Sequence, residues 1–105
     1  MKIETIKAFS KIPSHDLTLK SIFWPNDDEN NLTIQCENLH DKIVEFYFEW
    51  VTNLKIDLDL KENAQAMTWS IEAEINMIGM WDIVFNFPGI GFVSLECNKL
   101  EYREL

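Results

Sequence analysis

Basic residues are scarce in this chain, and their scarcity argues against two common classes of partner. Of 105 residues, nine are Lys or Arg and 18 are Asp or Glu, which gives a formal net charge of −9. Nucleic acids and anionic lipid surfaces are usually bound through clusters of Lys and Arg. Here the lysines are scattered and Arg103 is the only arginine. We therefore expect neither a nucleic-acid partner nor a membrane partner.

Glycine, proline and long apolar runs are also scarce. Three Gly and three Pro, with 47% hydrophobic and 26% charged residues, are typical of a globular chain without long irregular loops. The length fits a single domain over residues 1–105. No apolar run is long enough to cross a membrane, and Met1–Thr5 does not begin the apolar core of a signal peptide. These absences predict a cytoplasmic protein.

Cysteine is limited to two residues, Cys36 and Cys97, which fall at apolar positions of expected strands. Buried free thiols that behave as small hydrophobic side chains are the commoner arrangement. A disulfide between the two strands is an alternative that the sequence does not decide. Neither residue has a second cysteine nearby, which excludes a zinc knuckle and a CxxC redox site.

Catalytic motifs are missing as well, including the Gly-x-Ser-x-Gly elbow and the glycine-rich phosphate loops. His15 precedes Asp16, as in metal-dependent phosphohydrolases, but the further ligands of such a site are absent and a local hydrogen bond is the better interpretation. The run Asn26–Asn31 offers oxygens for calcium, with Glu37 at the final ligand position, but it has no turn glycine and fits a solvated turn. We predict no enzyme activity, no catalytic residue, no metal and no cofactor.

The clearest positive feature is an alternation of apolar and polar residues with period two, in at least five stretches. Successive side chains of a strand point to opposite faces, so this alternation is typical of a half-buried β-strand. One such stretch covers residues 67–77. Its apolar members, expected on a single face, are Met67, Trp69, Ile71, Ala73, Ile75 and Met77.

The same pattern sets out the strands along the chain. Residues 3–12 fit either a short helix or a strand. Turn-forming residues separate the later segments, as at 25–30 and 88–91, and Thr52 with Asn53 is expected to form a bulge or tight bend. The expected strands are 16–24, 31–37, 43–50, 54–60, 67–77 and 81–87, and residues 92–98 and 100–103 close the chain with one or two short strands.

Short strands with turns about every ten residues predict a mainly β fold. We expect a small antiparallel β-sandwich or curled meander of six to eight strands, with at most one or two short helices. The apolar phase of each strand gives the expected core. Its members are Leu17, Leu19, Ile34, Val44, Phe46, Phe48, Ile56, Leu58, Trp69, Ile71, Ile83, Phe85 and Leu95.

Outward-facing carboxylates are the main candidate for a binding surface. Asp57 and Asp59 lie on one expected strand, and Glu72 and Glu74 lie on the next strand along the chain. If the two strands pair, these four side chains share one solvent face. Such a face would bind a basic protein, although charged strand faces are more often simply solvated.

The register of that expected pair decides whether the charges are balanced. With Leu60 opposite Met67, Lys55 faces Glu72 and neutralises it. A two-residue shift would instead oppose Asp57 to Glu72, and the repulsion would then require a cationic partner.

Three segments of the chain add a specific hypothesis. Ser14–Leu17 opens an expected strand, Val44–Phe48 is followed by Leu54–Ile56, and Phe92–Cys97 comes near the end of the chain. In pattern, over half to two-thirds of its length, the chain resembles small bacterial β domains that include immunity proteins of polymorphic toxin systems and uncharacterised relatives. The resemblance implies a non-catalytic role, binding and neutralising a cognate toxin in the cytoplasm. An acidic surface would suit a basic nuclease toxin.

Two classes of function therefore stay open. The first is a protein-binding module, a monomer or homodimer, possessing a broad and shallow acidic surface with exposed aromatics. The second is a small-ligand or enzyme-like pocket that would use His15, His40 and Trp residues, and it should possess a deep cavity with convergent polar groups. The residues predicted to contact a protein partner are Asp57, Asp59, Glu72, Glu74 and Tyr47.

Overall fold

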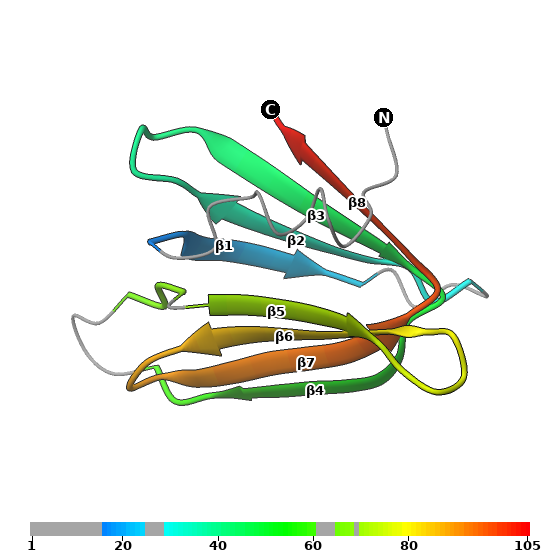
Figure 1. Cartoon of the computed structure of the whole chain (residues 1–105). Helices are drawn as coiled ribbons and strands as arrows, with labels where there is room; N and C mark the ends of the chain where they lie inside the picture. The colour runs from blue at the N-terminus through cyan, green and yellow to red at the C-terminus, as the bar shows by residue number, and fades with distance from the viewer. Residues whose placement is uncertain (1–15, 25–28, 61–64, 69) are drawn as a thin grey trace.

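The computed structural model describes residues 16–24, 29–60, 65–68 and 70–105. This part of the chain forms eight antiparallel strands in two sheets and contains no helix, which confirms the predicted all-β fold (Figure 1). The expectations for residues 1–15 lie outside the described residues. The strands are β1 Thr18–Phe23, β2 Leu32–Glu37, β3 Ile43–Glu49, β4 Thr52–Leu58, β5 Ser70–Ile75, β6 Trp81–Phe87, β7 Gly91–Cys97 and β8 Lys99–Glu104.

The strands divide into two four-stranded sheets. The first sheet has the order β1-β2-β3-β8, and the second has the order β4-β7-β6-β5. Neighbours that are consecutive in the chain, such as β2 with β3 and β6 with β7, form hairpins. The pairs β3–β8 and β4–β7 join segments that are far apart in the sequence.

One corner joins the two sheets. At this corner β3 runs into β4 through Trp50 and Val51, and β7 runs into β8 through Asn98 (Figure 1). Trp50 has a φ of 56°, and the amide of Asn98 donates a hydrogen bond of 3.0 Å to the carbonyl oxygen of Glu49. Strands that change sheets commonly do so through such bends. The paired ribbon β3–β8 therefore continues as the paired ribbon β4–β7.

The expected irregularity at Thr52 and Asn53 is confirmed. The register between β4 and β7 shifts between Thr52 and Lys55, and Asn53 has a φ of 52°. Asn tolerates this left-handed conformation better than most residues, because its short side chain can form local hydrogen bonds. The bend sets the direction in which β4 leaves the corner.

The core lies between the facing sides of the two sheets. Alternate residues of β2, β3, β6 and β7 are buried, as the period-two pattern predicts. Phe46 and Phe48 of the first sheet pack edge-to-face on Phe85 of the second, with ring centroids 5.3 and 6.2 Å apart. Edge-to-face pairs add about 0.5–1.5 kcal/mol to the burial of apolar area. These three rings fix how the sheets stack.

Most of the expected core is confirmed, with one error. Leu19, Leu58 and Ile71 are partly buried and pack against the core cluster. Ile56 is 49% exposed, so its assignment to the core was wrong, because β4 is an edge strand whose side chains are covered from one side only. Trp69 lies outside the described residues. The other expected members that are buried are Leu17, Ile34, Val44, Phe46, Phe48, Ile83, Phe85 and Leu95.

The alternating segment 67–77 does not form one strand. Met67 makes an isolated bridge to Thr18, and the amide of Leu19 donates a 2.8 Å hydrogen bond to the carbonyl oxygen of Ala66. The next residues enter the second sheet as β5. The expected single apolar face is therefore wrong for this segment: Thr68 of the polar phase is buried, whereas Ile75 and Met77 of the apolar phase are exposed.

Candidate functional site

The strands that carry the predicted acidic residues do not pair. β4 pairs with β7 and β5 pairs with β6, so β4 and β5 lie at opposite edges of the second sheet. Both registers considered from the sequence, including Leu60 opposite Met67, were therefore wrong. The cause is the corner described above, which places β4 beside β7 once β3 has paired with β8.

The predicted site residues consequently lie in three places. Asp57 is on the β4 edge and Asp59 follows the end of that strand, whereas Glu72 and Glu74 lie on β5 at the other edge. Tyr47 is half-buried in β3 of the first sheet. The two aspartates lie near one another at one edge and the two glutamates near one another at the other, so the four carboxylates do not form one surface. Tyr47 and the two glutamates belong to different faces of the molecule.

Glu72 and Glu74 are instead joined by two carboxylates that the sequence did not single out. Asp82 lies directly opposite Glu74 in the β5–β6 pair, and Glu96 lies directly opposite Asp82 in the β6–β7 pair. Directly opposed residues have Cβ atoms about 4.5–5.5 Å apart. Glu74, Asp82 and Glu96 therefore form one line across three strands, which we call the acidic row. It lies on the face of the second sheet that points away from the core.

Two polar side chains contact the acidic row. The side-chain amide of Asn76 donates to Asp82 Oδ1 at 3.1 Å and to Glu96 Oε2 at 2.6 Å. The hydroxyl of Thr52 donates to Glu96 Oε1 at 2.9 Å. Both donors are uncharged, so these hydrogen bonds orient the carboxylates and leave their net charge uncompensated.

Basic side chains are nearly absent from this face. In the four strands of the second sheet Lys55 is the only basic residue, and it lies opposite Ser94 on β7. Glu72 is three strands away from Lys55, which is roughly 14 Å at about 4.8 Å per strand. The neutralisation of Glu72 expected from the sequence is therefore not formed. The carboxylates of this outer face are Asp57, Glu72, Glu74, Asp82 and Glu96.

In the first sheet, two acidic residues form ion pairs with basic ones. Glu45 is 7% exposed, and Arg103 Nη2 lies 2.7 Å from its Oε1. Gln35 also donates to Glu45, at 3.1 Å. The other ion pair between described residues, Lys20 with Glu37 at 3.9 Å, belongs to the first sheet as well. Both ion pairs of the described residues thus lie in the first sheet.

Two hollows border the acidic row on the outer face. One, of about 370 Å³, is lined by residues of β5 and β6 that include Glu72, Glu74 and Asp82. The other, of about 340 Å³, is lined by residues of β4, β6 and β7 that include Asp82 and Glu96. Asp82 and Val84 line both. The first hollow therefore has acidic walls, whereas the second also contains Lys55 beside its two carboxylates.

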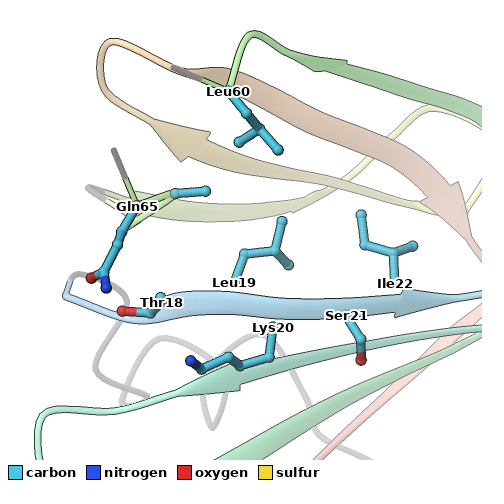
Figure 2. A pocket seen from close by; sticks show the side chains of 8 residues that line it. Thr18, Leu19, Lys20, Ser21, Ile22, Leu60 and Gln65 are labelled. Atoms are coloured by element: carbon cyan, nitrogen blue, oxygen red, sulfur yellow. The ribbon is translucent and has the colours of Figure 1, made fainter. Parts of the chain in front are cut away.

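A third cavity, of about 460 Å³, opens at the edge of the sandwich between β1 and the residues Leu60, Gln65 and Ala66 (Figure 2). Leu19 and Ile22 point into it from β1, and Leu60 points into it from the opposite side. Lys20 and Ser21 point away from it (Figure 2). Its walls are therefore mainly apolar, and polar groups do not converge in it as they would in a typical ligand pocket.

The histidine and cysteine residues form no reactive cluster in the described part of the chain. His15 lies outside that part, and His40 is exposed in the β2–β3 turn. Cys36 and Cys97 are free and buried. Burial raises the pKa of each thiol to about 12, and for Cys97 the charges of nearby Asp82 and Glu96 add to the effect. Both thiols are therefore protonated and unreactive near neutral pH.

Metal ligands do not assemble among the described residues either. In 16–24, 29–60, 65–68 and 70–105, no group of three or more His, Cys, Asp or Glu side chains could hold a metal ion. Asn26, Asp27 and Asp28 of the considered calcium loop lie outside these ranges. Glu37, its expected final ligand, belongs to β2 and pairs with Lys20.

Comparisons with known proteins found no match among protein-family models, curated proteins or solved structures. Within the described residues there is no helix long and apolar enough to span a membrane.

Proposed function

We propose that this chain is a non-catalytic protein-binding module that receives a basic partner on the outer face of its second sheet. The observation that carries the proposal is the acidic row, in which Glu74, Asp82 and Glu96 are directly opposed on adjacent strands. Like charges at directly opposed positions destabilise a sheet. A cationic surface placed against the row would remove this repulsion on binding.

Long-range charge supports the same proposal. A formal net charge of −9 attracts a basic protein over distances well beyond contact. Such steering raises the association rate and discriminates against acidic partners. The hollow lined by Glu72, Glu74 and Asp82 would accept a Lys or Arg side chain from the partner.

The specific form that we propose is an immunity-type inhibitor of a cognate toxin, acting in the cytoplasm. Its basis is the resemblance of the strand segments to small bacterial immunity domains, together with the acidic outer face. A basic nuclease toxin would suit that face. Neither a nucleic acid nor a membrane is part of the proposal, because the described outer face carries carboxylates where such partners need cations.

A small-ligand pocket is the competing function, and the cavity between β1 and Leu60 is its best support. The lining of that cavity is mainly apolar, and Lys20 and Ser21 point away from it (Figure 2). Specific ligand sites usually combine an apolar lining with a few convergent polar groups. The cavity supports this function less well than the acidic row supports protein binding.

Charge reversal tests the proposed surface. The partner is obtained by affinity capture from the native host, and the toxin encoded beside this chain, if there is one, is purified in parallel. Glu72→Lys with Glu74→Lys should weaken binding of that partner at least tenfold, because both exposed side chains border the proposed interface. Glu101→Lys with Glu104→Lys, on the first sheet, changes the net charge equally and serves as the control. Equal losses for both double variants, or no loss for either, would contradict the proposal.

A further inference from the structure

The β5–β6 hairpin exposes apolar side chains at its tip. Met77 is fully exposed, Ile78 is 75% exposed, and the preceding Ile75 is 60% exposed. Isolated apolar residues on a surface are ordinary, but contiguous ones mark interaction sites. The tip extends past the ends of β5 and β6 at the same end of the molecule as the corner (Figure 1). It is therefore accessible to a partner.

Asn76 fixes the shape of this tip. Its side-chain oxygen accepts hydrogen bonds of 3.0 Å from the amides of both Ile78 and Met80. The backbone N–H of Asn76 donates to the carbonyl oxygen of Met80 at 2.8 Å, and the backbone N–H of Gly79 donates to the backbone carbonyl oxygen of Asn76 at 3.1 Å. Gly79 adopts the φ of 83° that closes the turn. A tip held in this way loses little conformational entropy on binding.

The same side chain connects the tip to the acidic row. While its oxygen holds the turn, the Asn76 amide group donates to Asp82 and Glu96. The apolar tip and the carboxylates are thus parts of one hydrogen-bonded unit. A partner that contacts Met77 and Ile78 would meet negative charge immediately beside them.

A fourth exposed apolar residue belongs to the corner, which lies at the same end of the molecule (Figure 1). Trp50 is 51% exposed and precedes Thr52 by two residues. The hydroxyl of Thr52 donates to the same Glu96 that Asn76 contacts. Trp is enriched among the residues that contribute most to protein interfaces. Trp50 is therefore an exposed aromatic residue two positions from the Thr52 that contacts the Glu96 end of the acidic row.

We propose that the β5–β6 hairpin anchors the interface. Met77 and Ile78 insert between apolar side chains of a protein segment that also carries Lys or Arg, and these cations pair with the acidic row. This inference rests on the proposed function and specifies the partner's chemistry, namely a basic amphipathic segment. A second copy of the chain does not fit, because it would bring another acidic row and another charge of −9 to the contact.

A random peptide library displayed on phage tests the anchor without knowledge of the natural partner. The immobilised wild-type chain is used for selection, and the enriched peptides are then bound to variants. Peptides should combine Lys or Arg with large apolar residues, and their affinity for Met77→Ser with Ile78→Ser should fall at least tenfold. Circular dichroism and thermal unfolding check that each variant is folded.

The chain contains a matched control for these substitutions. In the β2–β3 turn, Asn38 makes the same four turn hydrogen bonds as Asn76, and Leu39 and His40 occupy the tip. Leu39 is 69% exposed. Leu39→Ser with His40→Ser should leave peptide affinity unchanged, because this turn has no acidic row attached to its Asn side chain.

The outcomes separate the anchor from the proposed function. Suppose that basic peptides bind Met77→Ser with Ile78→Ser as tightly as the wild type but no longer bind Glu72→Lys with Glu74→Lys. The hairpin would then not anchor the interface, and the acidic binding surface would be supported. Peptides that lack Lys and Arg and bind both double variants with unchanged affinity would contradict both proposals. A selection that enriches nothing for the wild type over the hairpin variant overturns the anchor. A dimer in sedimentation that disappears in the hairpin variant would also overturn it, since the tip would then bind a second copy.

Discussion

At the scale of single residues, Asn76 and Asn38 offer a direct comparison. Both hold a five-residue hairpin turn with the same set of hydrogen bonds. Of the two, Asn76 also donates side-chain hydrogen bonds to two carboxylates. Asn38→Ala should cost about 1–2 kcal/mol of unfolding free energy for the lost turn bonds. Asn76→Ala should cost about 1–2 kcal/mol more, because Asp82 and Glu96 lose their shared donor.

Salt distinguishes the two asparagine variants further. Without the Asn76 amide, repulsion within the acidic row is less well offset, and added salt screens that repulsion. The excess cost of Asn76→Ala over Asn38→Ala, measured by urea unfolding, should shrink as salt is raised. Identical costs at low and high salt would show that the carboxylate contacts of Asn76 do not matter for stability.

Gly91 is a residue at which only glycine fits. Its φ is 141°, and a Cβ atom at this position would overlap the carbonyl oxygen of Asp57 on β4. Gly91→Ala should therefore destabilise the fold by about 3 kcal/mol or more. Gly89→Ala is the control, because φ there is 75° but no atom lies within 4 Å of the added Cβ, and about 1 kcal/mol is expected. Chemical denaturation measures both, and equal costs would contradict the overlap.

The buried thiols make a pH-dependent contribution to the free energy of unfolding. Each has a pKa raised from 9.0 to about 12 by burial, so the unfolded chain releases these protons at lower pH than the folded chain. Their contribution is fully present below pH 9 and declines as pH rises from about 9 toward 12, by up to about 1.4 kcal/mol per pH unit and thiol. Cys36→Ala with Cys97→Ala should lower the slope of unfolding free energy against pH in this range. If the double variant shows the same slope as the wild type, the loss of stability between pH 9 and 12 does not come from these thiols.

At the scale of elements, the two edge strands of the second sheet differ in how far their apolar residues contact the core. Ile71 of β5 packs against the core cluster, whereas Ile56 of β4 is half exposed. Ile71→Asp should destabilise the protein severely, by about 3 kcal/mol or more, because a carboxylate would enter apolar surroundings. Ile56→Asp should cost clearly less in the same denaturation experiment. A larger loss of unfolding free energy for Ile56→Asp than for Ile71→Asp would contradict the burial described for these two strands.

Strands and the β1–β2 hairpin were predictable from this sequence, and the pairing of β4 and β5 was not. Period-two alternation depends on local burial, which is why the positions of β2, β3 and β6 followed from residues such as Ile34, Phe46 and Phe85. Pairing between β4 and β7 depends on the corner at Trp50 and Asn98, which no local pattern encodes. Sequence neighbours were therefore paired wrongly.

The candidate site was missed for the same reason. Asp82 and Glu96 each stand in an outward phase, beside buried Ile83 and Cys97, so their exposure to the outer face was readable from the sequence. Their alignment with Glu74 was not, because it needs two registers at once. The turn asparagine Asn76 was a further available signal, since Asn commonly opens tight turns through its side-chain oxygen.

At the scale of the whole molecule, charge and apolar exposure are unevenly distributed. Ion pairs between described residues are found in the first sheet, and the second sheet presents five carboxylates and Lys55 on its outer face. The apolar hairpin tip adjoins those carboxylates through Asn76. An acidic surface beside a rigid apolar projection is the arrangement on which the binding proposal depends.

The most direct test of that proposal is the salt dependence of the association rate with the captured partner. Surface plasmon resonance at low salt and at several times physiological salt should give an association rate constant that falls at least tenfold for the wild type, with a smaller change in dissociation. Glu72→Lys with Glu74→Lys should abolish most of that dependence, and Glu101→Lys with Glu104→Lys should leave most of it. An association rate that is indifferent both to salt and to reversal of Glu72 and Glu74 would contradict the acidic binding surface.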